Sequence, residues 1–263
     1  MNAKARMQAA LQGQPVHRRS ARQLAVAPLY LYLFLDAEVR RQALEGFRAL
    51  LGSRREVQLE PEAEVAIRAR AIQTAWGTLG ATPDWIWTHL LPPAAWLADC
   101  TLRREGNEIW RIHQPSGAVE ELSLPYPPDD SSTDVWHVSP PGSRAEVEAL
   151  IPVPSAGELL ADGSLTLARR LVETMGQETF VHGKMGAPFW RCYANLGFQG
   201  LMTMPLDRPQ LMHQMLERHT RAALAQVRAY AAAGVHGVFV EECLTSADLL
   251  SPRVYDEFVF PYD

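Results

Sequence analysis

Apolar residues along this chain occur both in short continuous runs and in repeats at helical spacing. The run Leu24–Leu35 is apolar on both faces, which is typical of a strand buried inside a parallel sheet or barrel. Asp36 then stands where a helix cap is expected, and apolar positions at helical spacing continue to Leu51, before Gly52. The pattern therefore predicts a first core strand that is followed directly by a helix.

The same strand and helix order returns in the second half of the chain. Asp207 and Gln210 have the spacing of a helix-capping pair, Gly234 stands at the end of that helix, and Ser251-Pro252 opens another. Repeated order with short connections favours an α/β fold with a parallel sheet. The expected elements are helices over residues 3–13, 62–79, 145–150, 165–175 and 207–233, strands over 178–183 and 235–240, and a strand or loop over 84–91.

Residues 99–124 interrupt this order. Thr101–His113 and Ala118–Leu122 alternate between apolar and polar residues on either side of the turn residues Gln114–Gly117, which predicts an antiparallel hairpin inserted between the strand and helix units. Pro125–Pro141 holds five prolines and is therefore expected to be a loop.

The last residues of the sequence are unusually apolar. Phe258, Val259, Phe260 and Tyr262 fall in a helix of about two turns, which needs a surface to pack on. We count about four or five parallel strands, fewer than the eight that close a barrel. We therefore expect an N-terminal arm helix within residues 1–22 and, over residues 23–263, a (β/α)8 TIM-type barrel that is incomplete at its C-terminus.

Composition narrows the class of protein. Hydrophobic residues make up 47% and charged residues 21%, as in folded globular chains. The formal charge of -5 argues against nucleic acid or anionic lipid as a partner, and no apolar run approaches the roughly 20 residues that span a bilayer. Three widely spaced cysteines and an N-terminus without a signal-peptide core predict a cytoplasmic protein without a disulfide framework.

Several stretches together resemble the uroporphyrinogen decarboxylase superfamily, which also contains corrinoid-dependent methyltransferases. The resemblance is collinear over nearly the whole chain, and its specificity comes from the order and spacing of the pieces. The stretches are Arg6–Val16, Gly186–Trp190, Leu196–Leu201, Asp207–Leu211, Tyr230–Val240 and Leu249–Tyr262.

This resemblance implies a (β/α)8 barrel with its chemistry at the carboxyl ends of the strands. It also implies that two or three strand and helix units are missing. In the methyltransferase branch a His-x-Cys pair and a later Cys bind zinc, and the corresponding ligands are expected beyond Asp263. The implied partners are a corrinoid or tetrapyrrole substrate and a corrinoid protein, whereas a decarboxylase would need no cofactor.

Two departures distinguish the branches. The decarboxylases carry an Arg-Gln-Ala-Gly-Arg-Tyr signature whose arginines hold substrate carboxylates, but Leu29–Arg41 has no such run, and Arg40 and Arg41 fall on a predicted helix. His89 stands where the decarboxylases have a catalytic aspartate. The leading hypothesis is methyl transfer between a small methylated compound or thiol and a corrinoid. Uroporphyrinogen decarboxylase is the alternative. The third is a truncated half-barrel that is non-catalytic or is completed by a partner or a second copy.

Four candidate catalytic residues follow from strand-end positions. Glu241 and Glu242 come directly after a predicted strand and suit acid–base work, although a solvated loop pair would look the same. His182 and His89 are candidate proton carriers or structural, hydrogen-bonded groups. Cys243 is a weak candidate for a metal ligand, and packing explains a lone cysteine equally well.

Aromatic residues supply the candidate binding surface. Trp190 and Tyr193, with Phe189 and Trp87, could stack on a flat tetrapyrrole or corrinoid ring, or could fill the core where a strand meets a helix.

Overall fold

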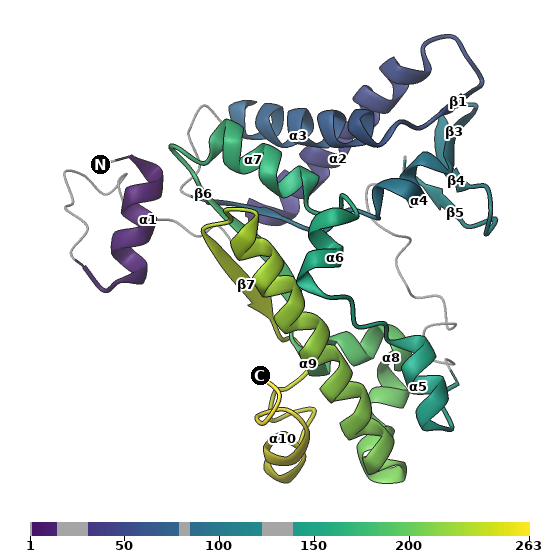
Figure 1. Ribbon diagram of the computed structural model, residues 1–263. Coiled ribbons are helices and arrows are strands. Elements are labelled where there is room, and N and C mark those ends of the chain that lie inside the picture. The colour runs from purple at the N-terminus through teal and green to yellow at the C-terminus, as the bar shows by residue number, and fades with distance from the viewer. Residues whose placement is uncertain (1, 15–30, 79–84, 123–138) are drawn as a thin grey trace. The chain divides into compact units, whose positions relative to one another are not determined.

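The computed structural model of the chain describes residues 2–14, 31–78, 85–122 and 139–263 (Figure 1). These residues form two compact units, each built from separate stretches of the sequence. The first unit comprises residues 1–128, 160–183 and 233–237, and the second comprises residues 129–159, 184–232 and 238–263.

The elements follow one another in a mixed α/β order. The helices are α1 (Ala3–Leu11), α2 (Leu31–Leu51), α3 (Pro61–Thr78), α4 (Ala94–Ala98), α5 (Arg144–Leu150), α6 (Ala156–Ala161), α7 (Thr166–Met175), α8 (Pro188–Asp207), α9 (Pro209–Ala232) and α10 (Pro252–Phe258). The strands are β1 (Glu56–Gln58), β2 (Trp85–Thr88), β3 (Cys100–Glu105), β4 (Glu108–His113), β5 (Val119–Glu121), β6 (Phe180–Gly186) and β7 (Gly237–Glu241).

The inserted hairpin is confirmed and is larger than predicted. Strands β3, β4 and β5 pair in antiparallel order, and β1 adds a fourth strand beside β3. Gly106, with a φ of 62°, makes the tight turn between β3 and β4. The buried side chains of Leu102 and Ile109 belong to the same hydrophobic cluster as Phe47 of α2.

A parallel sheet carries the strands expected at residues 84–91, 178–183 and 235–240. Its order is β2-β6-β7, and β2 pairs in parallel with β6 so that Trp87 lies opposite His182. In the described parts of the chain this sheet has three strands and stays open. The α/β class is confirmed, while closure into an eight-stranded barrel stays a prediction, as does the division into an arm and a barrel.

The prediction of a first strand at Leu24–Leu35 is wrong over residues 31–35. These residues are the first turns of α2, so the helix begins before Asp36 rather than at it, and residues 24–30 lie outside the described residues. A continuous apolar run fits a buried helix as well as a buried strand, and no Gly or Pro separates this run from the helical repeat that follows it.

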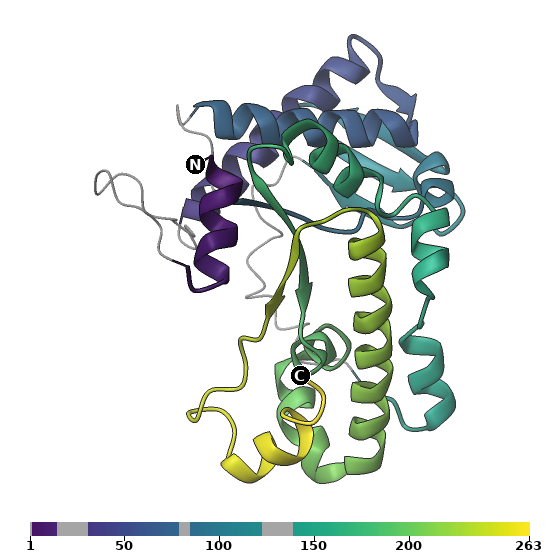
Figure 2. The same ribbon diagram turned by 60° about the vertical axis from the view of Figure 1, so that its left-hand side comes forward.

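The second unit is built around α8 and α9 (Figure 2). Helix α8 extends to Asp207, and α9 begins at Pro209, so the predicted capping by Asp207 is wrong. Gly234, with a φ of 82°, follows α9 as expected, and Ser251 caps α10 by accepting a hydrogen bond from the Val254 N–H. The apolar end of the chain finds its packing surface here, because Phe258 and Val259 are buried in the same cluster as Phe189, Leu196 and Met215.

A kink in α8 depends on Gly197, whose φ of 63° and ψ of 178° lie in a region that only glycine occupies readily. We expect Gly197→Ala to lower the free energy of unfolding by about 1–3 kcal/mol, measured by chemical denaturation. Gly77→Ala is the matched control, because a Cβ at this exposed helical glycine meets nothing within 4 Å. That control should be neutral or stabilising by up to about 1 kcal/mol. Equal effects of both substitutions would contradict the role of the kink.

Candidate functional site

In the second unit, an ion pair joins the carboxyl ends of β6 and β7. The Lys184 Nζ lies 2.9 Å from the Glu241 Oε2, and both side chains are partly exposed, at 25% and 30%. The Ala187 N–H donates to the Glu241 C=O at 2.8 Å, which holds the two strand ends together. The predicted strand-end position of Glu241 is thus confirmed, and its partner Lys184 is a charged residue that the sequence reasoning did not single out.

Glu242 occupies the amino end of α8. Its Oε2 accepts from the Trp190 N–H at 3.0 Å, and its Oε1 accepts from the Leu244 N–H at 3.1 Å. Trp190 is the third residue of α8, so the carboxylate satisfies an end group of the helix and lies at the positive end of its dipole. Burial raises the pKa of Glu242, and these backbone bonds oppose that shift. The geometry gives Glu242 a capping function, and a catalytic role for it stays a prediction.

The residues around the two glutamates do not form a metal centre. Cys243 is exposed, and burial of the thiol, followed by the charges of Glu241 and Glu242, raises its pKa and so disfavours the thiolate that binds metals. Across the described stretches, no three His, Cys, Asp or Glu side chains are grouped so as to hold a metal ion. The described residues therefore do not fit a zinc site, and the zinc expected from the sequence stays a prediction about residues outside them.

The predicted aromatic binding residues of the second unit differ in their surroundings. Trp190 and Tyr193 stack on each other, with ring centroids 5.4 Å apart and an interplanar angle of 8°. Both line a pocket of about 420 Å³ over α8, α9 and residues 150–152. Phe189 is fully buried in the core, which matches the core-filling alternative.

Two polar residues of this pocket were missed by the sequence reasoning. The Arg191 Nη2 donates to the Gln226 Oε1 at 2.6 Å, and burial lowers the pKa of the guanidinium. The buried His219 lies with its Nε2 2.8 Å from the Asn195 Oδ1, and burial together with the charge of Arg191 lowers its pKa to about 4. His219 is therefore neutral near pH 7. Its position on a helix face gave no signal that distinguished it from a surface histidine.

In the first unit, His182 is enclosed by aromatic rings. Its side chain is buried, and the centroid of its ring lies 4.2 Å from that of Trp85 and 6.3 Å from that of Trp87. The parallel register of β2 and β6 produces this cluster, because it sets Trp85 and Trp87 opposite Phe180 and His182. The packing matches that of a structural histidine, and a catalytic role for His182 stays a prediction.

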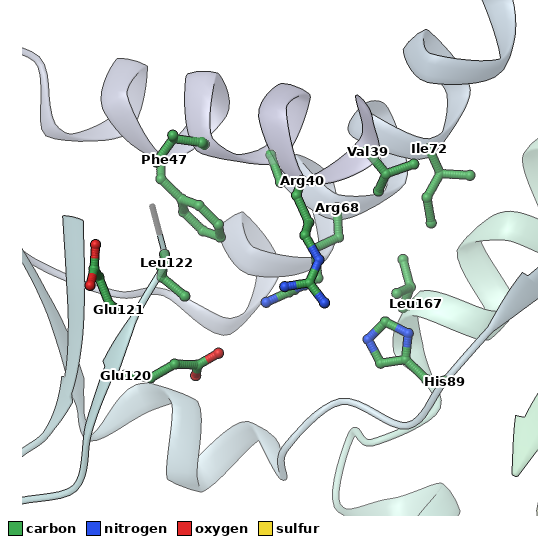
Figure 3. Close-up of a pocket in the computed structure, with 12 residues that line it drawn as sticks. Val39, Arg40, Phe47, Arg68, Ile72, His89, Glu120, Glu121, Leu122 and Leu167 are labelled. Carbon is green, nitrogen blue, oxygen red and sulfur yellow. The ribbon is translucent and has the colours of Figure 1, made fainter. Parts of the chain in front are cut away.

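His89, just after β2, lines a second pocket that lies wholly in the first unit (Figure 3). Arg40 from α2 and Arg68 from α3 line the same pocket, which has a volume of about 210 Å³. His89 thus lies at a pocket, and a catalytic role for it stays a prediction.

Comparison with known proteins finds a family to which part of this chain is similar. A profile described as uroporphyrinogen decarboxylase (URO-D) matches residues 133–263, which include Lys184, Glu241 and the whole of α8 and α9. Residues 133–263 are therefore similar to the uroporphyrinogen decarboxylase family. The family resemblance predicted from the sequence is therefore confirmed for this half of the chain.

Two curated members of the family are distant relatives. Uroporphyrinogen decarboxylase 2, chloroplastic, from Arabidopsis thaliana is 25% identical over 173 residues, which are 58% of this chain and 41% of the relative. The uroporphyrinogen decarboxylase of Prochlorococcus marinus is 26% identical over 167 residues, which are 58% of this chain and 46% of the relative. The matched segment thus spans less than half the length of either relative.

A solved structure extends the likeness to the entire chain. A methyltransferase from Methanosarcina mazei superposes with a TM-score of 0.52 and 18% sequence identity, covering 100% of this chain and 65% of that one. At this identity the likeness establishes a shared fold. None of the helices in the described stretches is both long and apolar enough to cross a membrane.

The neutral, buried His219 predicts a specific pH dependence. Because its pKa is about 4 in the folded state and near 6.5 when unperturbed, its contribution to stability is complete above pH 6.5 and is lost as the pH falls towards 4. We expect the difference in free energy of unfolding between the wild type and His219→Gln to shrink over this range by up to about 3 kcal/mol. Denaturant titrations at a series of pH values measure it, and a difference that stays constant with pH would contradict the assignment.

Proposed function

We propose that this protein is an enzyme of the methyltransferase branch, which transfers a methyl group between a small methylated compound or thiol and a corrinoid. One observation carries this choice: the likeness to a methyltransferase of the same fold covers the whole chain. The decarboxylases align with 58% of it. The absence of the decarboxylase arginine signature from Leu29–Arg41 supports the same choice.

The Lys184–Glu241 pair is the candidate reacting group of this chain. When a thiol is the acceptor, the Glu241 carboxylate would take the proton of its S–H group, so that the sulfur could form a bond to the methyl group that a bound methylcorrinoid would supply. Lys184, 2.9 Å away, orients the carboxylate. Glu242 and the Ala187 N–H fix the strand end and the start of α8 around this pair.

Zinc enters none of these steps, because the described residues do not supply a set of ligands for it. A corrinoid substrate and a corrinoid protein as partner remain part of the proposal. Decarboxylation of uroporphyrinogen is the second candidate, favoured by the two curated relatives that catalyse it by name. A half-barrel that is non-catalytic, or that a partner or second copy completes, is the third.

Two assays on the intact protein separate these candidates. The first follows the demethylation of methylcobalamin with 2-mercaptoethanol as the acceptor and zinc chloride in the buffer, and the second follows the formation of coproporphyrinogen from uroporphyrinogen. We expect turnover in the first assay only. Turnover of uroporphyrinogen would reverse the ranking, and no turnover in either assay would overturn the proposal in favour of the non-catalytic reading.

Within the first assay, Glu241→Gln tests the proposed base. We expect kcat to fall about 100-fold or more, in the range typical of losing a general base. Glu217→Gln is the matched control, because this exposed glutamate of α9 pairs with Arg221 on the helix surface. Its activity should equal that of the wild type. An unchanged kcat in Glu241→Gln would remove Glu241 from the mechanism while leaving the reaction class in place.

A further inference from the structure

The pocket over α8, α9 and residues 150–152 lies wholly in the second unit and has a positive charge in its wall. Among the described residues, its lining includes Arg191 and no Asp, Glu or Lys. His219 also lines it and is neutral near pH 7, because burial and the charge of Arg191 lower its pKa to about 4. The described lining therefore presents the single positive charge of Arg191 to a ligand.

Arg191 has no carboxylate partner in the described stretches of the chain. Its Nη2 donates to the neutral Gln226 Oε1 at 2.6 Å, and burial lowers the pKa of the guanidinium. None of its nitrogens is both buried and without a hydrogen-bond partner, so those that are not bonded to Gln226 are accessible. A guanidinium that is partly withdrawn from water without a counter-charge favours an anion as its further partner.

The aromatic part of the wall lies beside this charge on α8. Trp190 and Tyr193 stack on each other, and both residues are partly exposed where they line the pocket. Gly186 makes room for the indole, because a Cβ at this position would lie 2.5 Å from the Trp190 Cδ1. Since aromatic rings prefer offset-stacked or edge-to-face neighbours, a flat ring is a suitable body for the ligand.

Residues 150–152 add an apolar wall that hydrogen bonds hold against α9. The Arg218 Nε donates to the Ile151 C=O at 2.8 Å, and the Arg218 Nη2 donates to the Glu148 C=O at 3.2 Å. Leu150, Ile151 and Pro152 all line the pocket, whose volume is about 420 Å³. This volume falls within the range of roughly 300–1,000 Å³ that is common for small-molecule sites. The pocket therefore has room for a small molecule with an apolar body.

We propose that this pocket binds a small aromatic monocarboxylic acid, whose carboxylate accepts hydrogen bonds from Arg191 and whose ring lies against Trp190 and Tyr193. A carboxylate matches a guanidinium in planar geometry, and its one negative charge neutralises the single positive charge of the described lining. Neither Lys184 nor Glu241 lines the pocket. Binding there goes beyond the proposed methyl transfer and can be tested whether or not that reaction occurs.

Ligand-observed NMR with benzoate as the probe tests this binding on the intact protein. Benzamide keeps the shape and loses the charge, and cyclohexanecarboxylate keeps the charge and loses the flat ring. We expect benzoate to bind at millimolar concentration or below, benzamide at least about tenfold more weakly, and cyclohexanecarboxylate about two- to tenfold more weakly. Failure of benzoate to bind, or equal binding of either comparison ligand, would overturn the proposal.

Two arginines of the second unit supply a matched pair of variants. Arg191→Gln should weaken benzoate binding at least about tenfold, while Arg191→Lys, which keeps the charge but loses the planar fork, should lie between it and the wild type. Arg221→Gln is the control, because it removes the same charge from the surface of α9, where Arg221 pairs with Glu217. Equal losses in Arg191→Gln and Arg221→Gln would overturn the proposal, because benzoate would then bind elsewhere.

Thermal melting confirms that each variant is folded. Trp190→Leu provides a second test that leaves the charge of Arg191 in place. In this variant benzoate should lose its advantage over cyclohexanecarboxylate, because the stacking surface is gone. A preference for benzoate that stays as large as in the wild type would contradict the placement of the ring against Trp190.

Discussion

The candidate strand-end site depends on the backbone pairing of β6 along both of its edges. On one side β2 pairs with it in parallel, and on the other side β7 follows, in the order β2-β6-β7. The hydrogen bond from the Ala187 N–H to the Glu241 C=O lies where β6 ends and α8 is about to begin. Because β6 and β7 end together, the side chains of Lys184 and Glu241 meet as an ion pair. The chemistry proposed for this protein is thus a consequence of strand register.

The two units hold their charged groups in different ways. In the first unit the fully buried Glu64 is shared by Arg68 and Arg111, a network whose members cannot be removed singly without leaving a buried charge unpaired. In the second unit the side chains of the Lys184–Glu241 pair are partly exposed, so the pair is accessible from solvent.

The positions of the strands and helices were largely predictable, because hydrophobic period and turn residues determine them locally. The hairpin, the strands at β2, β6 and β7 and the helix after Ser251 follow from such signals. The continuous apolar run that leads into α2 could not be assigned to a helix or a strand, since a buried helix and a buried strand can both have such a sequence. The prediction that Asp207 caps a helix was also wrong, because α8 extends to Asp207 and α9 begins only at Pro209.

The site was predictable only in part. Strand-end position identified Glu241, but the sequence could not separate it from Glu242, whose carboxylate caps α8 through contacts made only in the folded chain. Trp190 and Tyr193 stack on each other, a pairing that follows from their spacing of three residues on a helix. Nothing in the sequence marked three further arginines as parts of buried or pocket-lining contacts: Arg68, Arg111 and Arg191. An arginine at a helical or alternating position looks like a surface residue in the sequence, and only tertiary packing buries it.

Amide hydrogen exchange measured by NMR tests most directly whether paired strands fix the candidate site. We expect the amide of Ala187, bonded to the Glu241 C=O, and that of His236, bonded to the Val181 C=O, to exchange as slowly as amides in the core of the protein. Exchange of both amides at rates typical of frayed termini would show that β7 is not held against β6. That result would contradict the assignment of Lys184 and Glu241 to one site.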